Sequence, residues 1–189
     1  MREGIWETPL GEVPVDSDLA GDLLEASSLA EPDAETHREE HSLEVQLPFI
    51  LFFRQDISIV PVCVRADARL EQLMDFGQAL AAVVRRAGEE VLIVASTDMS
   101  HYVDQETARN KDFSAIKKVL DLDPDGLYKT VLEERISMCG LQPTVAALAA
   151  AKDLGASRAE LVKYQTSGDV SGDFQRVVGY AGIRVLAGA

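Results

Sequence analysis

The chain has 189 residues, and 18 Lys and Arg stand against 32 Asp and Glu, which gives a net charge of −14 at pH 7. Hydrophobic residues make up 47% and charged residues 26%, a balance typical of globular proteins and not of disordered chains. The charge excludes nucleic acids and anionic membrane surfaces as partners, because binding to either requires clustered Lys and Arg.

The sequence shows no apolar targeting segment and no membrane span. Its most apolar stretches, residues 49–53 and 145–151, are far shorter than the roughly 20 residues that a spanning helix needs. The two cysteines are too few for a disulfide framework, so we expect a cytoplasmic protein. At this length we expect one domain over residues 1–189.

The chain begins with a turn, a helix and an acidic linker. Two prolines hold residues 8–16 in a turn between two short extended pieces. Asp16 or Ser17 can then cap a helix that continues to about Ser28. Residues 31–40 follow as an acidic linker.

Residues 40–49 fit two patterns. Leu43 and Leu47 follow helical spacing, whereas Leu43, Val45 and Leu47 also alternate as in a strand. We favour a helix, with Pro48 either kinking it or lying near its start.

Two strands and a helix are predicted next. The β-branched run at residues 57–64 predicts a strand, and Pro61 within it indicates a bulge or an edge position. Residues 69–87 have the apolar spacing of a helix. Residues 91–95 are continuously apolar, as is typical of a buried parallel strand.

The second half of the chain predicts three helices followed by two strands. The helices cover about 106–120, 123–133 and 142–154, and the strands cover about 161–166 and 176–186. The alternation of strands and helices predicts an α/β fold, with a mixed β-sheet flanked by helices on both faces.

The strongest candidate site follows the predicted strand at residues 91–95. Ser96-Thr97-Asp98-Met99-Ser100-His101-Tyr102 places polar side chains where open α/β sheets bind their ligands. Asp98, three residues before His101, could orient the imidazole or flank a site together with it. The alternative is an Asx turn with a surface histidine.

A second candidate is Cys139, which comes just before a predicted helix. Gly140 permits a tight bend and Pro143 suits the first helical turn. A helix N-terminus favours a thiolate, which suits a nucleophile or a metal ligand. The alternative is a buried cysteine that acts as a small hydrophobe, and that is our expectation for Cys63.

The remaining candidates are weaker. The pair Glu40-His41 could be a helix cap, a ligand pair or an acid–base pair, or a capped helix with a partly exposed histidine. We expect His37 to be solvated in the acidic linker. Asp169 and Asp173 lack the spacing of a calcium loop.

Seven short segments carry a family resemblance. They are Thr8-Pro9-Leu10-Gly11, Glu40-His41-Ser42-Leu43-Glu44 with Leu47-Pro48, Ile59-Val60-Pro61-Val62, Ser96-Thr97-Asp98-Met99-Ser100-His101, Cys139-Gly140 with Pro143, Tyr164-Gln165-Thr166-Ser167-Gly168-Asp169 and Val178-Gly179-Tyr180-Ala181-Gly182. In their order and spread they resemble the Memo family, also called AmmeMemoRadiSam system protein B.

The resemblance implies an α/β fold similar to class III extradiol dioxygenases, which bind non-haem iron. Memo-like proteins are associated with iron or copper at a site of two histidines and one cysteine. On this sequence the metal-ligating cysteine corresponds to Cys139. Asp98 and His101 match the family's pocket residues, which implies a catalytic role for them.

The family's two metal histidines lie in His-Ala-Gly-Tyr-like and Ser-His-His-like motifs, and neither motif occurs in this sequence. We therefore expect the chain to be the larger, C-terminal part of a Memo-like domain, and the alternative is a divergent member that has lost the site. The N-terminal part of the family fold should also contain strands. Without them one edge of the sheet would be exposed, and this edge could pair with a second copy of the chain to form a homo-oligomer.

Three functions follow from these observations. The first is binding of iron or copper, with redox or dioxygenase-like activity, because thiolate and imidazole suit these metals. The second is a non-catalytic module that holds a peptide or small molecule in the crevice near Asp98, His101 and Cys139. The third is a cysteine hydrolase with the same three residues as orienter, base and nucleophile.

Overall fold

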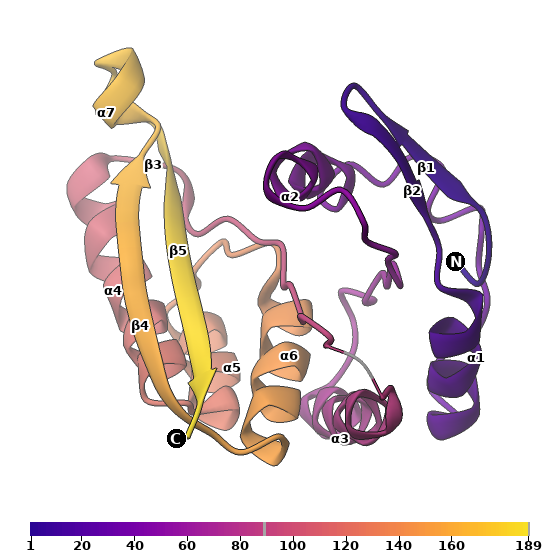
Figure 1. Cartoon of the computed structure of the whole chain (residues 1–189). Coiled ribbons are helices and arrows are strands. Elements are labelled where there is room, and N and C mark those ends of the chain that lie inside the picture. Colours follow the sequence, from indigo (N-terminus) through magenta and orange to yellow (C-terminus); the bar gives the residue numbers. More distant parts are fainter. Residues whose placement is uncertain (89, 189) are drawn as a thin grey trace.

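The computed structural model describes residues 1–88 and 90–188. Two groups of elements make up the fold (Figure 1). The first comprises β1 (Ile5–Thr8), β2 (Gly11–Pro14), α1 (Ser17–Ala26), a 3₁₀ turn (Glu44–Gln46), α2 (Leu47–Phe53) and α3 (Leu70–Arg86). The second comprises β3 (His101–Val103), α4 (Gln105–Leu120), α5 (Pro124–Glu133), α6 (Leu141–Asp153), β4 (Ala156–Thr166), α7 (Gly168–Ser171) and β5 (Val177–Ala187).

The described strands form two sheets, and the predicted α/β class is confirmed. β1 and β2 form an antiparallel hairpin, and the second sheet has the order β3-β5-β4 with antiparallel neighbours. In addition, Val15 and Ile59 form an isolated β-bridge, in which the two segments run parallel to each other.

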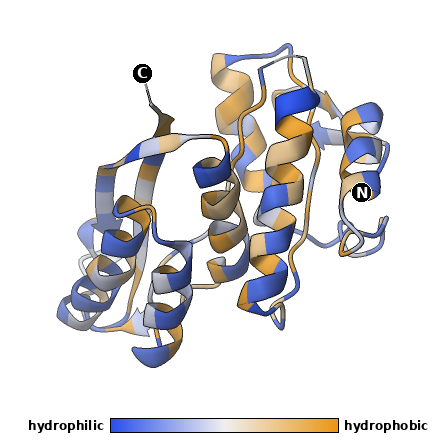
Figure 2. Cartoon of the chain, turned by 90° about the horizontal axis from the view of Figure 1, so that it is seen from below, coloured by the Kyte–Doolittle hydropathy of each residue, from blue (hydrophilic) through white to orange (hydrophobic). Residues whose placement is uncertain are grey.

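The main core lies between the larger sheet and its helices. Side chains of α3, α4, α5 and α6 pack there against one face of β4 and β5. The side chains of Leu161, Tyr164 and Ile183 lie on that face of the sheet. α3 then packs against both α6 and α1, so the layers continue towards the hairpin (Figure 1). The helices are apolar on the sides that meet and polar outside (Figure 2). The opposite face of the sheet carries the exposed side chains of Tyr180 and Arg184.

An aspartate immediately precedes three of the described helices and caps each of them. Asp16 accepts a hydrogen bond from the Leu19 N–H at 2.8 Å, which confirms it as the cap of α1. Asp104 and Asp123 cap α4 and α5 in the same way. Each cap satisfies a main-chain donor that the helix cannot pair internally, and its negative charge favours the helix N-terminus.

The ambiguous segment at residues 40–49 contains the start of a helix, as favoured from its spacing. α2 begins at Leu47, with Pro48 in its first turn, and a 3₁₀ turn at Glu44–Gln46 precedes it. Proline fits there because the first N–H groups of a helix have no internal partner.

Two predicted strands are absent from the described structure. Residues 57–64 form no strand beyond the bridge at Ile59, and residues 91–95 form none at all. Both predictions rested on β-branched residues. That preference yields a strand only where a neighbouring strand pairs with several successive main-chain groups. The end of β2 reaches only Ile59, whose N–H donates to the Pro14 carbonyl at 3.0 Å, and no described strand pairs with residues 91–95. Among the described residues, no helix is both long and apolar enough to cross a membrane.

Candidate functional site

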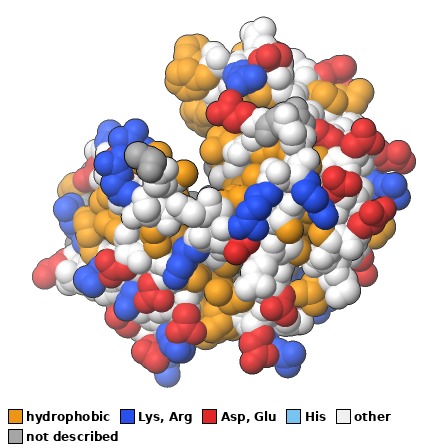
Figure 3. Space-filling model, turned by 60° about the horizontal axis from the view of Figure 1, so that its bottom comes forward, with side chains coloured by type: hydrophobic (Ala, Val, Ile, Leu, Met, Phe, Trp, Pro, Cys, Tyr) orange, Lys and Arg blue, Asp and Glu red, His pale blue; other side chains and the backbone are white. Residues whose placement is uncertain are grey.

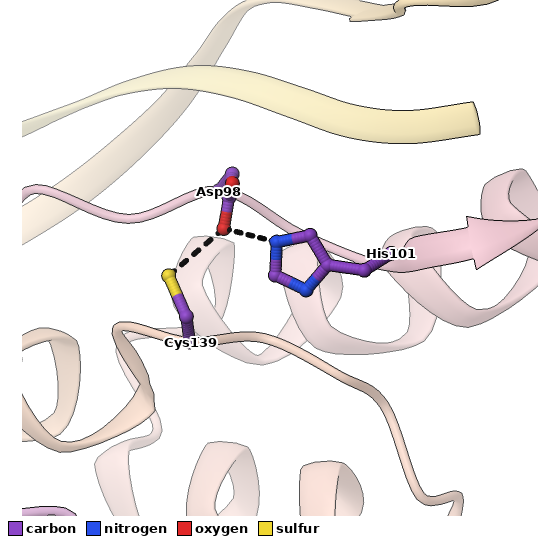
Figure 4. A group of neighbouring side chains, drawn as sticks. All are labelled: Asp98, His101 and Cys139. Atoms are coloured by element: carbon purple, nitrogen blue, oxygen red, sulfur yellow. Dashed lines mark hydrogen bonds and ion pairs between the residues drawn. The ribbon is translucent and has the colours of Figure 1, made fainter.

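Asp98, His101 and Cys139 come together in space (Figure 4). The Asp98 Oδ1 atom lies 2.8 Å from His101 Nε2, and the same oxygen accepts a hydrogen bond from the Cys139 thiol at 2.9 Å. One potential ligand atom from each residue lies within 4.8 Å of the other two. The fold therefore joins two candidates that are 41 residues apart in sequence.

The loop that carries Asp98 and His101 is held by four main-chain hydrogen bonds. Met99 donates its N–H to the carbonyl of Gly179 at 2.8 Å, and Gly179 donates its own N–H to Ser100. The Ser100 N–H donates to the buried Asp112 carboxylate at 2.9 Å. The His101 N–H donates to Ser137 Oγ at 2.7 Å. These bonds fix the direction of both functional side chains.

The backbone bends sharply directly after His101. Tyr102 has a φ of 57°, in the left-handed region that aromatic residues rarely adopt, and the pairing with β5 shifts register between His101 and Val103. The guanidinium of Arg176 lies 5.4 Å from the centre of the Tyr102 ring, which helps to hold that conformation. Strain of this kind is common beside functional sites, where a bulge redirects a side chain.

Cys139 is placed by the start of α6. Gly140 is the cap residue of this helix, and its N–H donates to Thr97 Oγ1 at 3.0 Å. A Cβ atom on Gly140 would overlap the side chain of Thr97 and lie 2.7 Å from the Ser96 carbonyl oxygen. The absence of a side chain at Gly140 therefore brings Cys139 close to the loop that carries Asp98.

The Cys139 thiol is not activated by its helix. Burial raises its pKa, and the hydrogen bond and negative charge of the Asp98 carboxylate raise it further, against an opposing hydrogen bond to the Asp98 main chain. The prediction that the helix N-terminus favours a thiolate was therefore wrong for the metal-free site. Burial is the main cause of this shift, and the nearby carboxylate adds to it by opposing ionisation.

The order of the three side chains does not match a cysteine hydrolase. In such an enzyme the histidine lies between the nucleophile and the acid. Here Asp98 lies between Cys139 and His101 and accepts the thiol proton's hydrogen bond itself (Figure 4).

The other candidate residues lie outside this group. His41 is exposed, while Glu40 accepts hydrogen bonds from Ser42 and from the Leu43 N–H, as a cap would. His37 is partly buried and hydrogen-bonds to the Asp33 carbonyl at 2.7 Å, so the prediction of a solvated side chain was wrong. Cys63 is also only partly buried, which corrects its assignment to the core. His37 and Cys63 both line a separate cavity of about 530 Å³.

One supporting residue, Asp112, escaped the sequence analysis. Asp112 is fully buried in α4 and accepts hydrogen bonds from the Ser100 N–H and from the Tyr164 hydroxyl. An aspartate on the buried face of a predicted helix is the signal that could have revealed it, because buried carboxylates need partners.

The three donor atoms suit a transition metal. Thiolate sulfur, imidazole nitrogen and carboxylate oxygen together match iron, copper or zinc and not magnesium or calcium, which prefer oxygen alone. Three protein ligands also leave positions open for a further molecule, as in catalytic metal sites. The residues present therefore fit the metal that the family resemblance implies.

Comparisons with known proteins identify the family of this chain. The model of the family described as "Memo-like protein" matches residues 1–184. A MEMO1 family protein of Methanopyrus kandleri is 41% identical over 184 residues, which is 97% of this chain and 65% of that protein. A MEMO1 family protein of Methanosarcina barkeri is 43% identical over 181 residues, which is 95% of this chain and 67% of that protein. The chain thus spans about two thirds of the length of these relatives.

Proposed function

We propose that this chain, which belongs to the Memo-like protein family, binds iron or copper through Cys139, His101 and Asp98. The observation that carries the proposal is the convergence of one sulfur, one nitrogen and one oxygen donor within 4.8 Å. Redox or dioxygenase-like activity of the whole protein is part of the same proposal, because iron or copper supplies a redox-active centre with open coordination positions when bound.

Each side chain has a distinct part in this site. Cys139 supplies the soft ligand and must lose its proton to do so. Asp98 already accepts that proton's hydrogen bond at 2.9 Å, so it is placed to receive it. While no metal occupies these donor atoms, the contact between Asp98 and His101 at 2.8 Å lets the two groups hold or move a proton beside a bound substrate, which is the catalytic role we assign to them.

Titration with Co²⁺ tests the metal site directly. Co²⁺ bound to a thiolate gives a sulfur-to-metal absorption band, which we expect in the unmodified chain and in Cys63→Ala. Cys139→Ala should remove the band, and His101→Ala should weaken binding by about tenfold or more. His41→Ala is the matched control, because His41 is exposed and lies outside the site. Absence of the band in the unmodified chain, or its survival in Cys139→Ala, would refute the proposal.

A second candidate function is metal-independent binding of a small apolar molecule. The cavity of about 530 Å³ lies in the size range of ligand pockets, and its lining includes Leu23, Val60, Val62 and Phe76. An environment-sensitive apolar dye should bind there and be displaced when Leu23→Trp fills the space. Dye binding that is unchanged in this variant would contradict the second candidate.

A further inference from the structure

We infer that Arg176 and Tyr102 bind the carboxylate end of a small aromatic substrate beside the candidate metal site. The inference rests on the proposed function, because it assigns a substrate class to the same site. Its basis is a row of side chains in which each one contacts the next. The row starts at the Cys139 thiol, passes through Asp98 and His101, and ends at the Tyr102 ring and the Arg176 guanidinium.

The bulge after His101 turns Tyr102 towards the site. Neighbouring residues of a regular strand point to opposite faces of the sheet. The centres of the His101 and Tyr102 rings lie only 5.9 Å apart, so the two side chains point to the same side. The φ of 57° at Tyr102 and the register shift between His101 and Val103 produce this departure from a regular strand. The strained residue therefore places an aromatic ring next to the donor atoms.

Arg176 reaches the same ring from the residue before β5. Its guanidinium lies 5.4 Å from the centre of the Tyr102 ring. The side chain is exposed, and in the part of the chain that the structure describes it forms no ion pair. Other exposed arginines do pair with a carboxylate, among them Arg54, Arg65 and Arg184. The guanidinium of Arg176 therefore remains available to an anion from solution.

The charges along the row select the anion and its orientation. With 32 Asp and Glu against 18 Lys and Arg, the chain repels anions in general, and acidic side chains are spread widely over the face in Figure 3. Arg176 favours an anion at one end of the row, whereas Asp98 disfavours one at the other end. A ligand with a single negative charge meets the least repulsion. A planar carboxylate also matches the guanidinium fork, which can bind both of its oxygens.

The rings of Tyr102 and His101 specify the rest of the ligand. A flat apolar ring packs against aromatic side chains in offset or edge-to-face arrangements. Tyr102 is 67% exposed, and the side chains of His101 and Asp98 are 21% and 29% exposed, so a ligand can reach all three. A carboxylate held at Arg176 directs the ring of the same molecule along Tyr102 towards His101. The far side of that ring then faces the donor atoms of the candidate metal site.

The test is a titration of the metal-free chain with benzoate, followed through the NMR signals of the His101 and Tyr102 rings. We expect saturable shifts of both signals over the millimolar range, because so small a ligand makes few contacts. Benzamide has the same shape without the charge, and it should bind about tenfold more weakly or worse. Acetate has the charge without the ring, and it should also bind more weakly than benzoate.

Substitutions at the two residues separate their contributions. Arg176→Gln should weaken benzoate binding by about tenfold or more, and Arg176→Lys should restore only part of the affinity, because an ammonium group lacks the planar fork. Tyr102→Asn suits the left-handed backbone and removes the ring, so it should abolish the preference for benzoate over acetate. Arg184→Gln is the matched control. It removes the same charge farther along β5, where Arg184 pairs with Glu160 at 2.6 Å, and it should bind benzoate like the unmodified chain.

Three results would overturn the inference. One is no saturable binding of benzoate to the unmodified chain. Another is equal binding of benzoate and benzamide, or benzoate binding that Arg176→Gln leaves unchanged. The third is displacement of benzoate by an equal concentration of inorganic phosphate, which would assign the guanidinium to a different anion. The Co²⁺ band tests the metal proposal separately, because benzoate binding without that band would refute the metal site alone.

Discussion

Tyr164 donates its hydroxyl hydrogen bond to the fully buried carboxylate of Asp112 at 2.7 Å. The other oxygen of that carboxylate accepts the Ser100 N–H at 2.9 Å, so the pair connects β4 with the loop that carries Asp98 and His101. Burial raises the pKa of Tyr164 well above its ordinary value, and the hydrogen bond to Asp112 adds to the shift. Tyr164 therefore remains a hydrogen-bond donor at every pH at which the chain would normally be studied.

Removing the Tyr164 hydroxyl should destabilise the fold. We expect Tyr164→Phe to lower the free energy of unfolding by about 1–3 kcal/mol, because one oxygen of a buried carboxylate loses its donor. Urea unfolding followed by circular dichroism measures the change. Tyr180→Phe is the control, since Tyr180 is half exposed, and it should cost little. Equal losses in the two variants would show that the Asp112 contact contributes nothing specific.

The elements with strong local signals were predicted to within a few residues. α1 has its aspartate cap, and α3 has a long apolar stripe that ends within a residue or two of the predicted bounds. The strands at residues 57–64 and 91–95 failed for a different reason. A helix closes its own hydrogen bonds, whereas a strand depends on a neighbour that sequence composition cannot reveal.

The sequence identified the three residues of the candidate site, but it did not predict how they affect the pKa of the Cys139 thiol. Asp98, His101 and Cys139 were each identified from local position, and the fold brings all three together. Their order in space, with Asp98 in the middle, depends on how α6 approaches the loop. That approach is a tertiary contact, so the raised pKa of the Cys139 thiol could not be anticipated from a helix N-terminus alone.

Glu40 should contribute stability that depends on pH. Partial burial alone would raise its pKa, but hydrogen bonds from Ser42 and from the Leu43 N–H outweigh this and lower the pKa. A carboxylate with a lowered folded pKa stabilises the fold above its unfolded pKa of about 4.3, and this stability is lost as the pH falls through the folded value.

Glu40→Gln should therefore be less stable than the unmodified chain at pH 7, and the difference should shrink between about pH 5 and pH 3. Thermal unfolding at a series of pH values measures it. Glu39→Gln, at an exposed neighbour, controls for the change in net charge. A difference that stays constant across this range would show that the hydrogen bonds do not favour the ionised form.

The thiol of Cys139 should react slowly although its side chain is exposed. Its raised pKa leaves less thiolate near neutral pH, and thiolate is the reactive form. In a Cys63→Ala background we expect iodoacetamide to modify Cys139 more slowly than the same thiol in the urea-unfolded chain. Asp98→Asn should speed the reaction, because the negative charge beside the sulfur is gone. Fast alkylation of Cys139 in the folded chain would instead support the hypothesis of a cysteine hydrolase.

Gly140 should control the metal site through its lack of a side chain. A Cβ at this position would overlap Thr97 and crowd the Ser96 carbonyl, so Gly140→Ala must push the start of α6 away from the loop. We expect a loss of stability of about 1–3 kcal/mol from the overlap. We also expect Co²⁺ affinity to fall by about tenfold or more, because Cys139 moves away from Asp98 and His101. Gly182→Ala in β5 is the control, as nothing lies within 4 Å of its Cβ position, and it should leave the affinity unchanged. If Gly140→Ala lost stability but kept full Co²⁺ affinity, the close approach of α6 to the Asp98 loop would not be what assembles the ligands.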